Sequence, residues 1–470
     1  MRFKRRWLVY FPVCFPIALG AFLLLTYLEP RPNILLITID ALRPDHLACY
    51  GYSLNTSPHI DNLAKEGILF SQAIAQSSIT FSSLPSLFTS TFPSSHGIEE
   101  LKDEVNFLNP SALTLAQILK DKGYHTGAIS GHGLIFSSVP GLDSGFDTIK
   151  DMLDAPANEI TQHAVKWLGN NRDRAHFLWI HYMDTHARYQ PPFPYDRLHL
   201  PIELKKQERE TLIKKYEWTA FEWAKGRIVF FPKQSSDGSL TEENRKYYIS
   251  QYDGEIGFVD EQIGILLGEL KQLGLDKKTL IILTSDHGEN LADYNKYFAH
   301  GFSLYDVELK VPLIIKINGR KSISAKVIGQ QVQSIDIMPT ILDILKIGKY
   351  NRRKLEGRSF LPLILNRKKE QFTYAFSELS NVIKNRILKS VRTADWKLVY
   401  DLSKRTYELY NLKNDPGETN NLIETEKDMF KLLKKKLEEW QARPRPRLIK
   451  AAKPLNEETK KRLRNLGYLQ

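Results

Sequence analysis

Five short apolar runs recur along the chain, with helix-like stretches between them. The runs are NILLITID (33–40), TGAIS (126–130), HFLWIHY (176–182), TLIILTSD (279–286) and VPLIIKI (311–317). Continuous apolar runs, as opposed to alternating ones, are typical of parallel strands that are buried on both faces. Helix-like segments such as 112–123 and 253–274 separate them. Strands that alternate with helices predict an α/β fold with a mostly parallel central sheet sandwiched by helices.

Two parts of the chain depart from this alternation. Residues 190–250 are polar and rich in aromatic side chains, and we expect an insertion there, either a cap near the site or an ordinary surface insertion. Residues 395–412 predict two strands around a polar turn, and a charged helix follows at about 424–441. We therefore expect a main domain over 29–370 and a small C-terminal α+β subdomain over 371–470, with an antiparallel sheet and a basic helical tail.

The beginning of the chain predicts a membrane anchor. Four cations among residues 2–6 precede WLVYFPVCFPIALGAFLLLTYL (7–28), which carries no charge. A helix of this length spans about 33 Å, enough for a hydrocarbon core of about 30 Å. Because the cations precede the span, we expect a membrane-anchored protein with a single N-terminal helix and a periplasmic or extracytoplasmic domain. The alternative is a cleaved export signal.

The net charge of +12 is concentrated at the two ends of the chain. Residues 2–6 contribute four positive charges and residues 431–470 contribute nine, so the rest of the chain is close to neutral. A nucleic-acid-binding protein needs a basic stripe that follows the phosphates, and we expect no nucleic-acid partner. The two cysteines, Cys14 and Cys49, provide no disulfide framework, because Cys14 lies inside the predicted span.

Acidic residues stand at the ends of two of the predicted strands. Asp40 ends the run 33–40, and Asp286 with His287 ends the run 279–286 in the motif TSDHGEN. In open α/β sheets, ligands bind at the carboxyl ends of the strands. A mixed set of oxygen and nitrogen ligands suits one divalent ion, with calcium favoured by oxygen and manganese or zinc by the imidazole. Alternatively, Asp286 only caps the following turn and His287 is structural.

The segment SSITFSSLPSLFTSTFPSSHG (77–97) resembles the active-site segment of the sulfatase family, in the alkaline phosphatase superfamily. That segment runs from a nucleophile through nine residues to Thr-Gly, for which Thr89-Ser90 stand here, and this register places Thr80 at the nucleophile position. Sulfatases carry a Cys or Ser there, oxidised to formylglycine, with Pro two and Arg four residues on. Here Ser82 and Leu84 occupy those positions. The resemblance therefore implies a Thr80 alkoxide nucleophile, and no formylglycine is expected.

Ordered matches extend the resemblance over nearly all of residues 29–470, so that 29–370 is expected to be a sulfatase-like catalytic domain. The matching segments are 39–52, 57–67, 181–192, 299–315, 333–345, 355–364 and 408–422. The resemblance implies that Asp40, Thr80, Asp286 and His287 hold the metal. It also implies catalytic or substrate-binding roles for His186, His300 and, more weakly, His132. Alternatively, each histidine is a structural residue whose ring nitrogens are satisfied by ordinary hydrogen bonds.

Three departures from the family pattern weaken the sulfate-ester interpretation. Ala41 stands where the family often has a second acid, His132 lies where many sulfatases have a lysine, and Thr80 lacks the modification motif. We expect a metal-dependent hydrolase of sulfuric or phosphoric esters, with phosphoesters somewhat favoured and a small-molecule, glycan or lipid ester as substrate. The alternatives are an envelope phosphoryl-group transferase and a catalytically inactive, sulfatase-like binding protein.

Overall fold

A computed structural model describes residues 31–99, 104–200, 242–295, 297–318, 324–348, 355–367, 374–381 and 386–446, together with 452–454, 457 and 460. The predicted membrane segment, 7–28, lies outside the described residues, as does most of the expected insertion 190–250 and of the tail beyond 446. Among the residues that are described, no helix is long and apolar enough to cross a membrane. The structure therefore does not support the prediction of a membrane-anchored protein with a single N-terminal helix.

The centre of the molecule is a large mixed sheet with the strand order β11-β2-β10-β7-β1-β6-β4-β5, in which β12 also pairs with β2. Its strands are β1 (Asn33–Ile39), β2 (Ile68–Ile74), β4 (His125–Ser130), β5 (Thr148–Asp151), β6 (His176–Tyr182), β7 (Thr279–Ser285), β10 (Lys310–Ile317), β11 (Lys326–Ile328) and β12 (Val332–Gln333). The pairs β1–β6, β1–β7, β4–β6 and β4–β5 are parallel, whereas β10 runs antiparallel to both β7 and β2. The predicted α/β class is confirmed, with β10 as the exception to the parallel direction.

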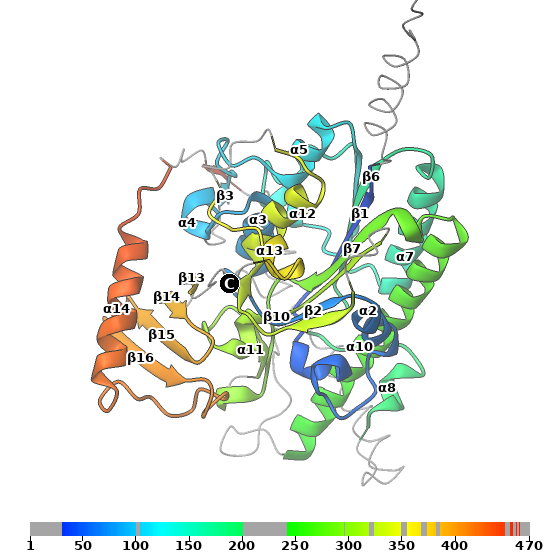
Figure 1. Ribbon diagram of the computed structural model, residues 1–470. Helices are drawn as coiled ribbons and strands as arrows, with labels where there is room; N and C mark the ends of the chain where they lie inside the picture. The colour runs from blue at the N-terminus through cyan, green and yellow to red at the C-terminus, as the bar shows by residue number, and fades with distance from the viewer. Residues whose placement is uncertain are drawn as a thin grey trace, which may run out of the picture.

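Helices cover both faces of this sheet (Figure 1). The helices are α2 (Pro58–Glu66), α3 (Thr80–Thr89), α4 (Pro93–His96), α5 (Leu115–Asp121), α6 (Ile135–Ser138), α7 (Ala157–Asn170), α8 (Tyr195–Leu198), α10 (Glu242–Gln272), α11 (Asp306–Leu309), α12 (Ile337–Ile344) and α13 (Leu361–Ile364). Alternate residues of β1 enter two separate cores. Leu35 and Ile37 pack with α2, α7 and α10, and Ile34 and Leu36 pack with α3, α5 and α12. Burial on both faces explains why β1 reads as one continuous apolar run.

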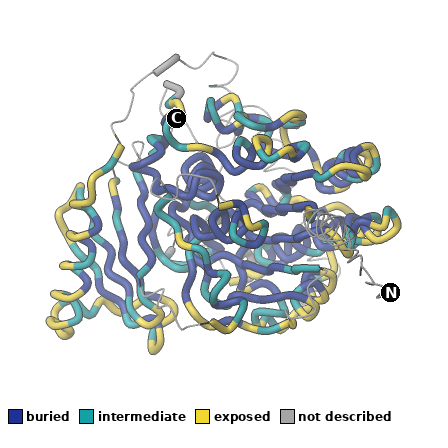
Figure 2. Tube along the Cα trace, turned by 45° about the horizontal axis from the view of Figure 1, so that its top comes forward, coloured by how far each residue is buried: buried dark blue, intermediate teal, exposed yellow. Residues whose placement is uncertain are grey.

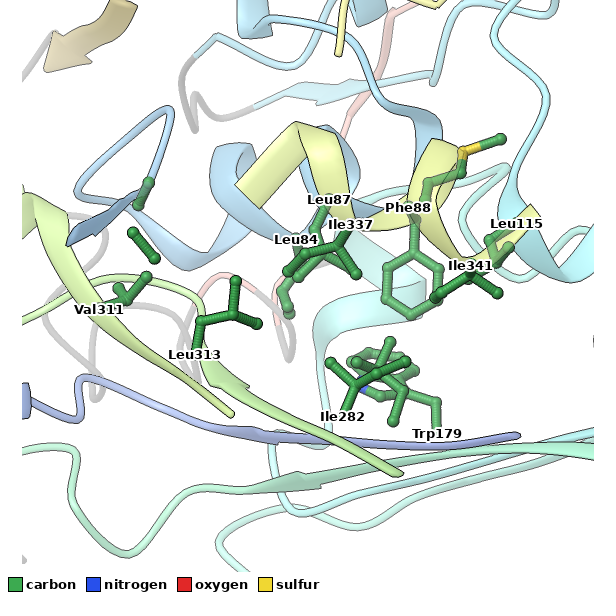
Figure 3. Close-up of a cluster of buried hydrophobic side chains, with 14 of the residues drawn as sticks. Leu84, Leu87, Phe88, Leu115, Trp179, Ile282, Val311, Leu313, Ile337 and Ile341 are labelled. Carbon is green, nitrogen blue, oxygen red and sulfur yellow. The ribbon is translucent and has the colours of Figure 1, made fainter. Parts of the chain in front are cut away.

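The helix α3 is anchored on the sheet by its own apolar side chains (Figure 3). Leu84, Leu87 and Phe88 are all buried in the same core as Trp179 of β6, and the rings of Phe88 and Trp179 are 4.7 Å apart in an edge-on contact. Leu84 is fully buried. The position at which the sulfatase pattern has an arginine is thus occupied here by a side chain of the hydrophobic core. This packing fixes the start of α3, and with it Thr80, against the central sheet.

A separate four-stranded antiparallel sheet follows in the order β13-β14-β15-β16, and α14 packs along it. Its elements are β13 (Ala375–Asn381), β14 (Arg386–Arg392), β15 (Trp396–Asp401), β16 (Thr406–Asn411) and α14 (Lys427–Gln441). Short ladders complete the fold: β3 (Glu104–Asn106) pairs with β17 (Ala452–Pro454), and β8 (Asn290–Leu291) pairs with β9 (Tyr297–Ala299). The predicted C-terminal antiparallel sheet is confirmed. In Figure 2 the strands of both sheets are largely buried, and exposed residues gather in outer turns and on helix surfaces.

A buried cluster of charges joins this second sheet to the main domain. Asp306, the first residue of α11, pairs with Arg392 of β14 at 2.7 Å and with Lys397 of β15 at 2.5 Å. Glu418 lies 2.9 Å from the Lys397 ammonium and also accepts a hydrogen bond from the backbone N–H of Asp306 at 2.6 Å. Burial by itself would raise the pKa of Asp306, but the two cations hold it well below its usual range. The start of α11 is therefore fixed by residues of the C-terminal sheet.

Candidate active site

The register of the central sheet brings two aspartates together. Ile39 of β1 is paired with Ser285 of β7, so Asp40 and Asp286 each lie one residue beyond a paired position at the carboxyl edge. Both are fully buried, as is His287. Apolar strands of equal register thus place two carboxyl groups side by side where a polar site is expected in such sheets.

The hydroxyl of Thr80 lies between these groups. Thr80 begins α3, directly after the extended Ile79. Its Oγ1 is 3.3 Å from Oδ2 of Asp40 and 3.0 Å from Nε2 of His287. The structure therefore brings together all four residues that the sequence indicated as metal ligands.

Ligand atoms from Asp40, Asp286 and His287 all lie within 4.8 Å of one another. Nδ1 of His287 donates a hydrogen bond to the carbonyl of Gly288 at 2.8 Å, so the lone pair of the neutral ring is on Nε2. That nitrogen lies 3.3 Å from Oδ2 of Asp286 and 4.0 Å from Oδ1 of Asp40. Neither of these two carboxylate oxygens makes a hydrogen bond, although both are buried. Buried, unsatisfied oxygens that face an imidazole nitrogen are a donor set that fits a divalent cation.

The charges in the cluster lower the pKa of Asp40 and raise that of His287. Burial alone would raise the pKa of Asp40, but a hydrogen bond from His181 and the nearby His186 and His287 hold it well below its usual range. Burial would lower the pKa of His287, yet the charges of Asp286 and Asp40 raise it. Asp40 is accordingly ionised at neutral pH and offers a carboxylate to a cation.

Backbone groups orient Asp286. Its Oδ1 accepts hydrogen bonds from the N–H of Ala41 at 3.2 Å and from its neighbour His287 at 2.9 Å, and the Ser83 hydroxyl donates to its carbonyl at 2.5 Å. Ala41 adopts a left-handed φ of 54°. The residue that replaces the family's second acid thus contributes a backbone N–H, which directs Oδ2 of Asp286 towards the cluster.

Two of the three predicted active-site histidines join the cluster. The ring of His300 lies 4.2 Å from that of His287, and the ring of His186 lies 4.9 Å from that of His300. Nδ1 of His186 donates to the carbonyl of Ala187 at 2.7 Å. Burial lowers the pKa of His186, and it lowers that of His300 to about 3. Both rings are therefore neutral at pH 7.

The third histidine, His132, occupies a different position. Its ring contacts Phe81 at 4.9 Å and lies 6.4 Å from that of His181. Burial lowers its pKa to about 3. His132 thus adjoins the Asp40 side of the site as a neutral ring.

Two buried residues behind the site were not anticipated from the sequence. His181 of β6 lies with Nε2 3.2 Å from Oδ2 of Asp40, and its Nδ1 is 2.8 Å from the hydroxyl of Thr38. Since a carboxylate only accepts, Nε2 carries the proton and Nδ1 accepts from Thr38. The Thr38 oxygen in turn accepts from Nε1 of Trp179 at 2.8 Å. The pairing of Thr38 with His181 could have indicated this contact, but it can be deduced only once β1 and β6 are recognised as parallel neighbours.

Glu289, in the TSDHGEN motif, is the other residue that was missed. It is fully buried, and its Oε1 lies 3.3 Å from Nδ1 of His300. Burial raises its pKa to about 7, although the nearby His186 and His287 act in the opposite direction. Glu289 thus orients the ring of His300.

A mostly parallel sheet between helical layers, followed by a separate antiparallel sheet, is the architecture of the alkaline phosphatase superfamily. Within that class, the family model for sulfatases matches residues 32–347, and the model for the C-terminal part of N-sulphoglucosamine sulphohydrolase matches 294–443. The first match covers more than half of the chain. This protein belongs to the sulfatase family, and it is an ester hydrolase of that family.

Individual relatives agree with this assignment. An uncharacterized sulfatase of Escherichia coli K12, YidJ, is 28% identical over 443 residues, which cover 84% of this chain and 83% of that protein. An enzyme solved with its substrate D-glucosamine-2-N,6-O-disulfate has a TM-score of 0.70 at 21% identity and covers 87% of this chain and 97% of its own. The phosphonate monoester hydrolase of Agrobacterium radiobacter has the same TM-score and identity, with 87% and 95% covered. The two structures confirm the fold.

Proposed function

We propose that this protein is a metal-dependent hydrolase in which Thr80 is the nucleophile, and that it cleaves phosphoric esters in preference to sulfuric esters. Sulfatase-family proteins typically bind a divalent metal. The observation that supports the proposal best is the position of the Thr80 hydroxyl, 3.0 Å from Nε2 of His287 and 3.3 Å from Oδ2 of Asp40. A hydroxyl at the start of a helix, inside a cluster of ligand atoms, is placed to attack an ester bound in front of it.

Asp40, Asp286, His287 and Thr80 would hold the metal. A divalent cation there supplies positive charge that stabilises an ionised threonine oxygen and neutralises the oxygens of the ester. The unsatisfied Oδ1 of Asp40 and Oδ2 of Asp286 would then both be used. The same cation would compensate for the burial of two carboxylates.

The chain's own residues suit each step of an ester hydrolysis. Thr80 loses its hydroxyl proton along the hydrogen bond to Asp40, and its oxygen forms a bond to phosphorus as the bond to the leaving alcohol breaks. The neutral rings of His186 and His300 flank the ester oxygens, and the departing alkoxide takes up a proton from water. Water then attacks the phosphothreonine, which releases phosphate and returns the proton to Thr80.

The side chain of Thr80 favours phosphorus over sulfur. A formylglycine hydrate can expel sulfate by re-forming its carbonyl group, whereas an alkoxide that has accepted a sulfuryl group depends on water to remove it. Threonine cannot be oxidised to formylglycine. The buried Leu84 also leaves no arginine at the position that the family pattern reserves for one.

The test is turnover of three aryl esters, a sulfate, a phosphate monoester and a phosphate diester, by the full chain with added manganese, zinc or calcium. We expect phosphoester cleavage that is lost in Thr80→Ala and partly retained in Thr80→Ser, together with a protein mass gain of one phosphoryl group on rapid quenching. Asp286→Asn should lose metal and turnover together. Sulfate release as the dominant activity, or full phosphoester cleavage by Thr80→Ala, would contradict the proposal.

A further inference from the structure

A cavity of about 750 Å³ opens beside the cluster of histidines. Its walls come from the segment after β6, the loop before α7 and the middle of α10; they include His186, Asp184, Arg188, Phe193, Glu255 and Glu261. Cavities of this size are typical of small-molecule sites. His186 lines the cavity and its ring also contacts that of His300, so His186 lies between the cavity and the candidate active site.

The cavity has an excess of acidic groups. Asp154, Asp184, Glu255 and Glu261 line it, against a single arginine, Arg188. Asp154 is the group whose charge acts on Arg188, so this pair is balanced. The remaining three carboxyl groups have no cation of their own among the lining residues.

Asp184 and Glu255 are the most deeply placed of these acids. Oδ1 of Asp184 accepts from the N–H of Ala157 at 2.9 Å, whereas its Oδ2 is buried and makes no hydrogen bond. Glu255 is 4% exposed and accepts from the N–H of Gln190 at 2.6 Å. Burial raises the pKa of Asp184 to about 6 and raises that of Glu255 well above its usual range, and the charge of Asp184 further opposes ionisation of Glu255. A bound cation would remove that repulsion.

Aromatic and apolar side chains complete the walls. Phe193, which is 74% exposed, and Phe258 both face the cavity, and the guanidinium of Arg197 already stacks on the Phe193 ring at 5.0 Å. Aromatic faces beside carboxylates are the surroundings that an alkylammonium group prefers. An anionic leaving group, by contrast, would meet an excess of negative charge.

We propose that this cavity binds the alcohol portion of the ester, and that this alcohol carries a positively charged amino or ammonium group held by Asp184 and Glu255. The inference rests on the proposed ester hydrolysis at Thr80 and extends it to a class of substrate. The ammonium group lies beyond His186, and the ester oxygen faces Thr80.

The test uses two alcohols of the same shape, choline and its uncharged carbon analogue 3,3-dimethylbutan-1-ol. Isothermal titration calorimetry on the full chain should show choline binding roughly tenfold tighter or more, the preference expected for a charge-assisted contact. Asp184→Asn keeps the acceptor for Ala157, removes the charge and should abolish the preference. Glu261→Gln, at an exposed position of α10, should weaken it, and Asp173→Asn, an exposed acid outside the cavity, should leave it unchanged.

Equal affinities for the two alcohols, or a preference that survives in Asp184→Asn, would overturn the inference. The binding measurement is independent of turnover and should give the same preference in Thr80→Ala. Failure of the proposed function would be detected in a different experiment, as phosphoester cleavage that persists in Thr80→Ala. As a second readout, phosphate release should be faster from phosphocholine than from 3,3-dimethylbutyl phosphate, by a similar factor.

Discussion

Replacing Thr38 with valine tests whether the residues behind the site control the metal. Thr38 is fully buried, and its hydroxyl accepts from Nε1 of Trp179 and donates to Nδ1 of His181, both at 2.8 Å. His181 in turn donates to Oδ2 of Asp40 at 3.2 Å. Valine has nearly the same shape, so Thr38→Val removes the hydroxyl and its two hydrogen bonds while the packing of β1 stays intact.

The expected cost follows from these contacts. A buried donor left without a partner costs about 1–3 kcal/mol, and a lost hydrogen bond about 1 kcal/mol. The indole N–H and the acceptor nitrogen of His181 together give a loss of about 2–4 kcal/mol in the free energy of unfolding. His181 also loses the partner that fixes its tautomer and ring orientation. Loss of such an outer contact typically lowers metal affinity about 10- to 100-fold.

Two measurements on the same variants separate the effects. Urea unfolding gives the stability, and titration calorimetry with Mn²⁺ at constant pH gives the metal affinity. In a Trp179→Phe background the indole N–H is absent, so Thr38→Val should cost about 1–2 kcal/mol less there, while its effect on metal affinity should persist. Metal affinity within a factor of about two of the unchanged protein would refute the role assigned to His181.

Three further substitutions have expected outcomes. Leu84→Arg, which restores the arginine of the family pattern, should destabilise the protein by several kcal/mol because it buries an unpaired charge in the core, and a thermal melt followed by circular dichroism will show this. Asp306→Asn leaves Arg392 and Lys397 without their shared carboxylate and should cost about 3–5 kcal/mol in urea unfolding; a loss below about 1 kcal/mol would contradict the argument. Gly288→Ala would place a methyl group 2.1 Å from the carbonyl oxygen of Val307, so we expect a displaced His287 turn and a loss of metal binding in calorimetry, and unchanged binding would disprove this.

The parts of the fold that the sequence predicted are those in which burial leaves a direct signal. The runs that became β1, β6 and β7 are buried along their whole length, and a continuous apolar pattern follows from that. The antiparallel direction of β10 was not predictable, because an apolar run is the same in either direction. β2 was overlooked, since Ser71 and Gln72 interrupt its apolar pattern where it is only half-buried.

In the site, residues that follow a strand were easier to recognise than residues within one. Asp40 and Asp286 stand out as acids at the end of apolar runs, and the sequence motif adds His287. His181 and Thr38 lie inside strands, where a single polar residue gives no sign of its partner until the strand order is known. The segment 7–28 was predicted as a membrane helix from its composition alone; it lies outside the described residues, which contain no helix long and apolar enough to cross a membrane.

The charge cluster at the start of α11 has a practical consequence for anyone who shortens this chain. A truncation near residue 370 would remove Arg392, Lys397 and Glu418 together, and with them both cations that pair with Asp306 and the carboxylate that accepts its backbone N–H. The carbonyl of Glu308, in the same short helix, accepts the backbone N–H of Gly288, the residue after His287. The sequence changes its pattern near residue 371, yet the smallest unit that keeps the contacts supporting the Asp286–His287 turn extends at least to Glu418. Expression trials, limited proteolysis and domain swaps should therefore treat residues 31–441 as indivisible.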